Sequence, residues 1–195
     1  MSSLHLPPRY TAGDAARVFW RPRVKNLYGL LRPRPVKMDE DGRLPASIEL
    51  VWMPVYAFRM RLVRGDKTGT LWVSVDASFG GFALFERMDA LEDGEFDGES
   101  FEPVLTVPEA ERFGRDGVVR YFLRKRGGPK PSDMSVEEHC LYHTPVWVYY
   151  FRRGKKIDLA VLDGYTGERM GSRMRIAVLE AFIRRRQEQR GNDCD

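Results

Sequence analysis

Polar and apolar residues alternate along residues 48–62, and this alternation is the strongest structural signal in the chain. One face of the segment carries Glu49, Arg59 and Arg61. The other face is apolar and consists of Ile48, Leu50, Trp52, Pro54, Tyr56, Phe58, Met60 and Leu62. A period of two over this length predicts a β-strand. Turn residues at 64–69 and an apolar run at 71–76 complete a hairpin, and a third strand is predicted at 82–85.

A second hairpin is predicted in the last third of the chain. Residues 146–151 are rich in β-branched and aromatic side chains, which favour strands. Gly154 and Lys155 suit a two-residue turn, and residues 157–163 return as the partner strand. Together with the first hairpin, this segment indicates an antiparallel sheet.

Helices are predicted from about Ala12, Thr106 and Ser172. The first two begin with a threonine followed three residues later by an acid, the pattern of a capping box. The last helix has two neighbouring apolar stripes, which are Ile176, Leu179 and Ile183, and Met174, Val178 and Phe182. We expect this broad apolar surface to face the core.

Three segments recur at an offset of roughly 90 residues, so the chain contains an internal repeat. TAGDAAR at 11–17 recurs as TVPEAER at 106–112, LVWMPVY at 50–56 as LYHTPVW at 141–147, and VDASFG at 75–80 as LDGYTG at 162–167. Helix cap, proline-bearing strand and aspartate turn follow in the same order each time. Because the spacing changes only where loops absorb deletions, we predict a duplication.

These patterns together predict an α+β fold of two repeated units. Each unit would be a helix packed on a twisted antiparallel sheet, with an additional helix at the C-terminal end. The first repeat is predicted at residues 1–88 and the second, with the last helix, at residues 105–195. Residues 89–104 between them contain many acids and are predicted to form a linker.

The segment DLAVLDGYTGE at 158–168 resembles the closing strand and turn of PepSY-type domains, which have a cystatin-like α+β fold. The first repeat departs from this motif, because Phe79, Gly80 and Gly81 replace its T-G-E turn. The resemblance implies a helix packed on a curved antiparallel sheet and a binding or inhibitory role. It implies no catalytic residue.

Composition excludes several classes of protein. With 43% hydrophobic residues the chain has enough apolar surface to fold without disulfides, and we expect its two cysteines to be reduced. We find neither a membrane-spanning segment nor a signal peptide, which predicts a cytoplasmic protein. A net charge of +4 is too small for the strong positive field of a dedicated nucleic-acid-binding protein.

Few residues suggest catalysis or metal binding. His139, Cys140 and His143 are the densest set of potential metal ligands, and a helix would place the two histidines on one face, but three ligands do not close a structural zinc site. Asp76 and Asp163 recur at equivalent positions, where an aspartate that leads into a glycine turn binds backbone amides. We therefore predict that the protein has no catalytic residue, no cofactor and no metal, and that it is not an enzyme.

The basic residues are the remaining candidates for a functional surface. Clusters at the tip of the second hairpin and in the last helix are candidate contacts to nucleic acid or a partner: Arg152, Arg153, Lys155, Lys156, Arg184, Arg185 and Arg186. A further cluster lies at 124–126. Our main hypothesis is a non-catalytic protein-interaction or adaptor module that binds a protein partner or a second copy through sheet edges. The alternatives are a nucleic-acid-associated protein and, third, an enzyme of unknown class.

Overall fold

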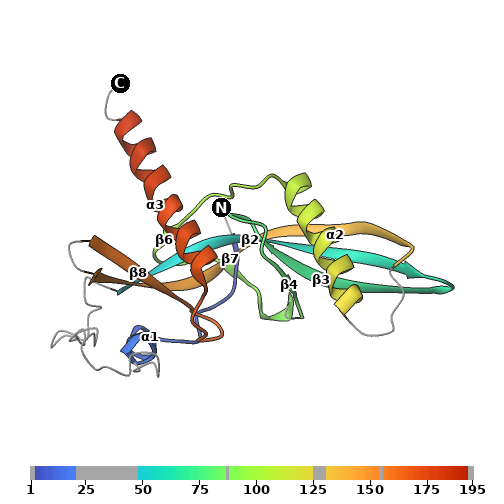
Figure 1. Cartoon of the computed structure of the whole chain (residues 1–195), viewed down its shortest axis with the longest axis horizontal. Coiled ribbons are helices and arrows are strands. Elements are labelled where there is room, and N and C mark those ends of the chain that lie inside the picture. Colours follow the sequence, from blue (N-terminus) through green and yellow to red (C-terminus); the bar gives the residue numbers. More distant parts are fainter. Residues whose placement is uncertain (1–2, 21–47, 87, 125–130, 154–155, 193–195) are drawn as a thin grey trace. The chain divides into compact units, whose positions relative to one another are not determined.

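The computed structural model describes residues 3–20, 48–86, 88–124, 131–153 and 156–192, and its fold belongs to the mixed α+β class (Figure 1). Within these residues eight strands form one mostly antiparallel sheet. The strands are β1 (Ser3–His5), β2 (Ile48–Arg64), β3 (Lys67–Asp76), β4 (Phe82–Leu84), β5 (Glu92–Gly94), β6 (Glu99–Ser100), β7 (Asp133–Arg153) and β8 (Lys156–Asp163). The helices are α1 (Ala12–Trp20), α2 (Val107–Arg124) and α3 (Ser172–Asn192), with a short 3-10 turn, η2 (Met88–Ala90). The α+β class is thus confirmed.

Both predicted hairpins are present. The strands follow the order β4-β3-β2-β7-β1-β5, and β6 pairs with β2 and β8 with β7. In the β2–β3 hairpin Val55 lies opposite Asp76, and in the β7–β8 hairpin Val146 lies opposite Asp163. The short strand β1 runs parallel to β7 and antiparallel to β5.

The chain divides into two compact units that do not follow its sequence order. Unit 1 consists of residues 1–6, 53–96 and 100–143, and unit 2 of residues 7–52, 97–99 and 144–195. The divisions fall inside β2 and β7, so each of these long strands contributes to both units. Each predicted repeat is therefore distributed over both units.

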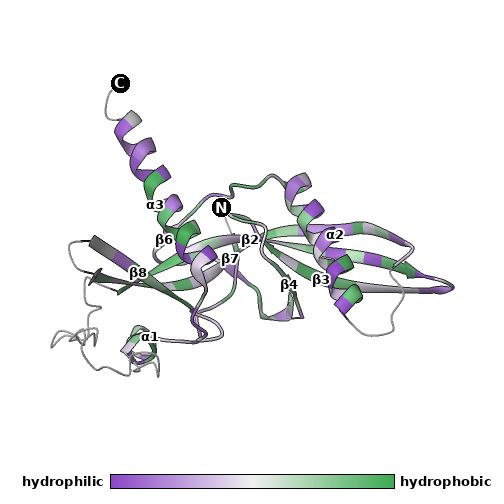
Figure 2. Ribbon diagram, viewed as in Figure 1, coloured by the Kyte–Doolittle hydropathy of each residue, from purple (hydrophilic) through white to green (hydrophobic). Residues whose placement is uncertain are grey.

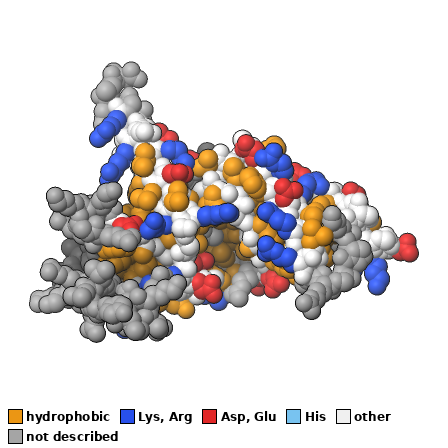
Figure 3. All heavy atoms as spheres, viewed as in Figure 1, with side chains coloured by type: hydrophobic (Ala, Val, Ile, Leu, Met, Phe, Trp, Pro, Cys, Tyr) orange, Lys and Arg blue, Asp and Glu red, His pale blue; other side chains and the backbone are white. Residues whose placement is uncertain are grey.

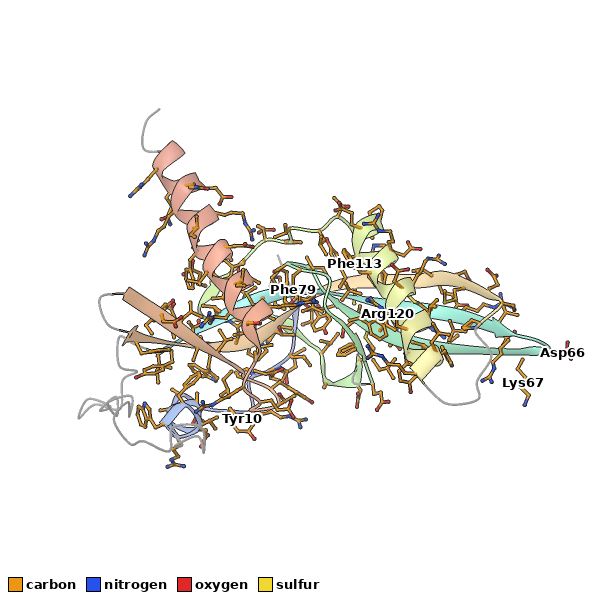
Figure 4. All side chains as sticks on the ribbon, in the orientation of Figure 1. Tyr10, Asp66, Lys67, Phe79, Phe113 and Arg120 are labelled. Carbon is orange, nitrogen blue, oxygen red and sulfur yellow. The ribbon has the colours of Figure 1, made fainter. Side chains whose placement is uncertain are left out.

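In unit 1 the helix α2 packs on β3 and β4. The alternation predicted for β2 is present there, because Tyr56, Phe58, Met60 and Leu62 all belong to the core beneath the helix while Arg59 and Arg61 are exposed. Val73 and Val75 of β3 and Ala110 and Val118 of α2 complete this core. Colouring by hydropathy shows the hydrophilic tip of the β2–β3 hairpin (Figure 2), where Asp66 and Lys67 are labelled in Figure 4.

In unit 2 the β7–β8 hairpin lies between two helices (Figure 1). Ala15, Ala16 and Phe19 of α1 share a core with Trp147, Tyr149 and Leu162. Helix α3 packs on β8, and its Phe182 ring lies 6.2 Å from that of Tyr150. Since successive residues of a strand point to opposite faces, α1 and α3 cover opposite faces of the hairpin.

Candidate functional site

Both predicted capping boxes are present, and they fix where α1 and α2 begin. Thr11 donates a hydrogen bond from its hydroxyl to Asp14 Oδ2 at 2.7 Å, and Thr106 donates one to Glu109 Oε2 at 2.8 Å. The backbone amide of each threonine donates to the same carboxylate. Hydrogen bonds from the threonines lower the pKa of both carboxyl groups. Each acid thus serves as part of a helix cap.

Asp76 and Asp163 lie in turns with the same hydrogen bonds. Asp76 Oδ1 accepts the amides of the residues two and three positions on, at 2.8 and 3.2 Å, and Asp163 Oδ1 accepts the corresponding amides at 2.8 and 2.9 Å. The carbonyl of each aspartate accepts the amide of a glycine four residues on, Gly80 or Gly167, at 2.9 Å. Both glycines have positive φ angles, 72° and 73°. The carboxylates are thus occupied in holding the turns, as the sequence predicted.

In each unit the turn binds the segment that precedes the helix. Ala77 O accepts the amides of Val104 and Leu105 in unit 1, and Gly164 O accepts those of Arg9 and Tyr10 in unit 2. A side chain of the proline-bearing strand adds a second contact in each unit. Tyr56 donates its hydroxyl to Leu105 O at 3.2 Å, and Trp147 donates its indole N–H to Tyr10 O at 2.8 Å. Tyr10 is labelled in Figure 4.

Asp76 is 7% exposed, and this burial raises its pKa to about 6 despite the amides that it accepts. Between pH 3.8, the ordinary pKa of an aspartate carboxyl, and about pH 6, the folded protein retains a proton on Asp76 that the unfolded chain has lost. Asp76 therefore lowers the stability of the fold as pH rises through this window, by up to about 3 kcal/mol.

Replacing Asp76 with asparagine should remove this pH dependence. In Asp76→Asn the side-chain oxygen still accepts both amides, but no charge is buried above pH 6. The free energy of unfolding of variant and wild type is measured by urea denaturation at pH 4 and at pH 7.5. The advantage of the variant over wild type should be larger at pH 7.5 than at pH 4 by up to about 3 kcal/mol. An equal difference between variant and wild type at both pH values would contradict this assignment.

The histidine and cysteine residues considered for metal binding lie in β7 and not in a helix. Adjacent strand residues point to opposite faces, so His139 and Cys140 do not share a face. His139 stacks on Phe58 at 6.1 Å, and His143 contacts the ring of Phe96 at 5.2 Å. Burial lowers the pKa of His143 and raises that of the Cys140 thiol. Within the described ranges no group of three or more potential ligands could hold a metal ion.

The predicted basic contacts lie in three elements of unit 2. Arg152 and Arg153 end β7 and Lys156 begins β8, whereas Lys155, like residues 125 and 126, lies outside the described residues. Arg184, Arg185 and Arg186 lie on α3. Arg185 is paired with Glu99 at 3.0 Å, so one member of the predicted cluster is bound to an acid of the predicted linker.

The core-facing surface predicted for α3 is partly wrong. Met174, Ala177, Val178 and Ala181 are buried, whereas Ile176, Leu179 and Ile183 are 49%, 39% and 54% exposed. One stripe is enough to cover β8, and the stripe that contains the small residues Ala177 and Ala181 allows the closer approach. Figure 3 shows hydrophobic side chains along α3 with Lys and Arg side chains beside them. We name Ile176, Leu179 and Ile183 the α3 stripe.

Two polar contacts flank the buried side of α3. Tyr150 donates its hydroxyl to Glu49, and burial followed by this contact raises the pKa of the tyrosine. Arg175, near the start of α3, pairs with Asp158 of β8 at 3.1 Å. The Arg175 pair and the Arg185 pair hold the helix on unit 2 with the α3 stripe facing outward. Sequence reasoning missed this surface, although the arginines near both ends of the stripe were a signal for it.

None of the described helices has the length and hydropathy needed to span a membrane. The resemblance to PepSY-type domains stays a prediction from its motif. Comparisons with protein-family models, with curated proteins and with solved structures find no match for this chain.

Proposed function

We propose that this chain is a non-catalytic protein-interaction module built from a duplicated α+β unit. The matched contacts of the two units support the duplication. In both units a capped helix is preceded by two residues that bind an aspartate turn, and an aromatic side chain bonds to the carbonyl just before the cap. The caps, the turns and the aromatic side chains that make these contacts lie in the segments that recur in the sequence.

The pairing of helices with hairpins is exchanged between the proposed repeats. Helix α1 precedes the β2–β3 hairpin in the chain, yet its buried core partners lie in β7 and β8, apart from Ile48 of β2. Helix α2 precedes the β7–β8 hairpin, yet it packs on β3 and β4. An exchange of this kind arises when two copies that swapped helices as a dimer become joined in one chain. It leaves each proposed repeat dependent on the other.

The observation that carries the functional proposal is the contrast between the aspartate turns and the α3 stripe. The two recurring carboxylates accept backbone amides in the same way, so they are accounted for by folding. Three of the five exposed large hydrophobic residues in the described chain lie on α3, which has no counterpart among the described residues of the first repeat. Exposed apolar side chains gathered on one element favour a contact with another macromolecule. The PepSY-like motif supports binding over catalysis.

The full-length chain should recover a protein partner from an extract of its host. The tagged protein would be incubated with nuclease-treated extract, washed at rising salt concentration and analysed by mass spectrometry. We expect one protein in stoichiometric amount that withstands the salt washes, because apolar contacts do not weaken with salt as phosphate contacts do. Recovery of nucleic acid alone, released by salt, would favour a nucleic-acid-associated protein and overturn the proposal, and so would recovery of no stoichiometric protein.

A further inference from the structure

The α3 stripe has the spacing of a surface that another helix can contact. Ile176, Leu179 and Ile183 are three and four residues apart, so they lie on one side of the helix over about two turns. Their burial differs sharply from that of Met174, Ala177, Val178 and Ala181, which are at most 6% exposed. Because these buried residues hold α3 on unit 2, its outward side is presented on a fixed support.

Arginines continue the α3 stripe beyond both of its ends. Arg173 precedes Ile176 by three residues, and Arg186 and Arg190 follow Ile183 by three and seven. All three are exposed and form no direct ion pair among the described residues, although the charge of Arg186 also acts on Tyr150 of β7. By contrast, Arg175 and Arg185 of α3 form direct ion pairs with acids of unit 2. The outward side of α3 is therefore apolar in the middle and positive at both ends.

This pattern of charge disfavours a second copy of the chain as the occupant of the stripe. Antiparallel pairing of two α3 helices would place Arg173 of one copy near Arg186 of the other. Parallel pairing would place each arginine near its own equivalent. Both arrangements bring like charges together beside an apolar contact, which costs free energy.

The residues beside the stripe also favour a protein over an anionic membrane surface. Exposed Glu180 lies four residues after Ile176 and three before Ile183, so its carboxylate is at the edge of the stripe. An anionic lipid surface would repel this carboxylate, whereas a basic residue of a protein partner would pair with it. The stripe itself carries no tryptophan or tyrosine, which commonly anchor interfacial helices.

We propose that the outward side of α3 binds an acidic amphipathic helix of a partner protein. Apolar residues of that helix pack on Ile176, Leu179 and Ile183, and Asp or Glu residues near its two ends pair with Arg173 and with Arg186 and Arg190. This inference rests on the proposed function and adds the binding surface and the chemical class of the partner.

Site-specific cross-linking in the full chain tests the inference. Ile183 is replaced in one variant by the photo-cross-linker p-benzoylphenylalanine, and Leu123 of α2, which is 56% exposed, is replaced in a matched control. Both are irradiated in host extract, and the cross-linked peptides are sequenced. We expect one protein to cross-link at position 183 and not at 123, through a segment with apolar residues at helical spacing and a net negative charge.

The sequenced segment is then synthesised and its affinity for purified full-length protein is measured. Reversing two charges in Arg173→Glu/Arg186→Glu should weaken binding at least about tenfold, while Leu123→Ser should change it less than about twofold. The inference would be overturned by cross-links to lipid, nucleic acid, a basic segment or a second copy. Equal cross-linking at both positions, or no cross-linking, would overturn it as well. If the extract still yields a stoichiometric partner in such a case, the proposed interaction function stands and only its assignment to α3 falls.

Discussion

Residues 89–195 expressed alone should fail to fold into a stable monomer, and so should residues 1–88. In the first fragment the β7–β8 hairpin loses α1, which exposes the apolar faces of Trp147, Tyr149 and Leu162. Exposing a large apolar side chain costs about 1.5–3 kcal/mol, and the total stability of a domain is only about 5–15 kcal/mol. In the second fragment the core of β2 and β3 loses α2. Loss of cooperative thermal unfolding, followed by circular dichroism, is the expected result.

Co-expression of the two fragments provides the control for this prediction. Each fragment supplies the helix that the other lacks, so the pair should associate one to one and unfold in a single cooperative transition. A break between residues 88 and 89 lies outside all α-helices and strands. If either fragment alone is monomeric and unfolds cooperatively, each hairpin can bind its own helix, and the exchanged arrangement is not required for folding.

Local structure was predictable because its signals lie within a few residues of one another. The threonine and acid that cap α1 and α2 are three residues apart, and the alternation in β2 needs no distant partner. The aspartate turns are likewise complete within six residues, from Asp76 to Gly81 and from Asp163 to Glu168. Each of these elements is found where its pattern indicated.

Which helix binds which hairpin was not predictable from these signals. Both helices start with the same cap, and both hairpins offer an apolar face, so the sequence does not distinguish a helix packed on its own hairpin from an exchanged one. The choice depends on the path of the chain between elements, which local patterns do not encode.

Short strands of charged residues were also missed. The acidic segment predicted as a linker contains β5 (Glu92–Gly94), which pairs with β1, and β6 (Glu99–Ser100), which pairs with β2. Strand pairing is made by backbone groups, so a strand at a sheet edge needs no apolar alternation. The composition of this segment therefore indicated a linker, although its backbone belongs to the sheet.

The choice between the two stripes of α3 depends on packing that sequence patterns do not capture. Both stripes are apolar, and on hydropathy alone the larger side chains of Ile176, Leu179 and Ile183 are better suited to burial. The stripe that contains Ala177 and Ala181 is buried because small residues bring the helix closer to β8. The candidate functional surface is the stripe that remained outside.

Replacing Gly167 with alanine should destabilise the protein by about 2–5 kcal/mol, for two separable reasons. The residue has a φ of 73°, which costs about 1–2 kcal/mol for a residue with a Cβ. The added Cβ would also overlap the ring of Tyr10. The Tyr10 ring is partly buried against the core that α1 shares with β7 and β8, so moving it aside loses packing, and its backbone is held by hydrogen bonds to Gly164 O and from the indole of Trp147.

Gly65 in the β2–β3 turn is the matched control that separates these two costs. Its φ is 56°, but a Cβ there would meet nothing within 4 Å, so Gly65→Ala should cost only about 1–2 kcal/mol. Adding Tyr10→Ser to Gly167→Ala removes the steric conflict and should make the double variant more stable than the sum of the single effects predicts. Free energies of unfolding are measured by urea denaturation for Gly167→Ala, Gly65→Ala, Tyr10→Ser and the double variant. If Gly167→Ala costs no more than Gly65→Ala, Tyr10 does not fix the segment before α1 against the Asp163 turn. The contacts matched between the two units would then make no measurable contribution to the free energy of unfolding.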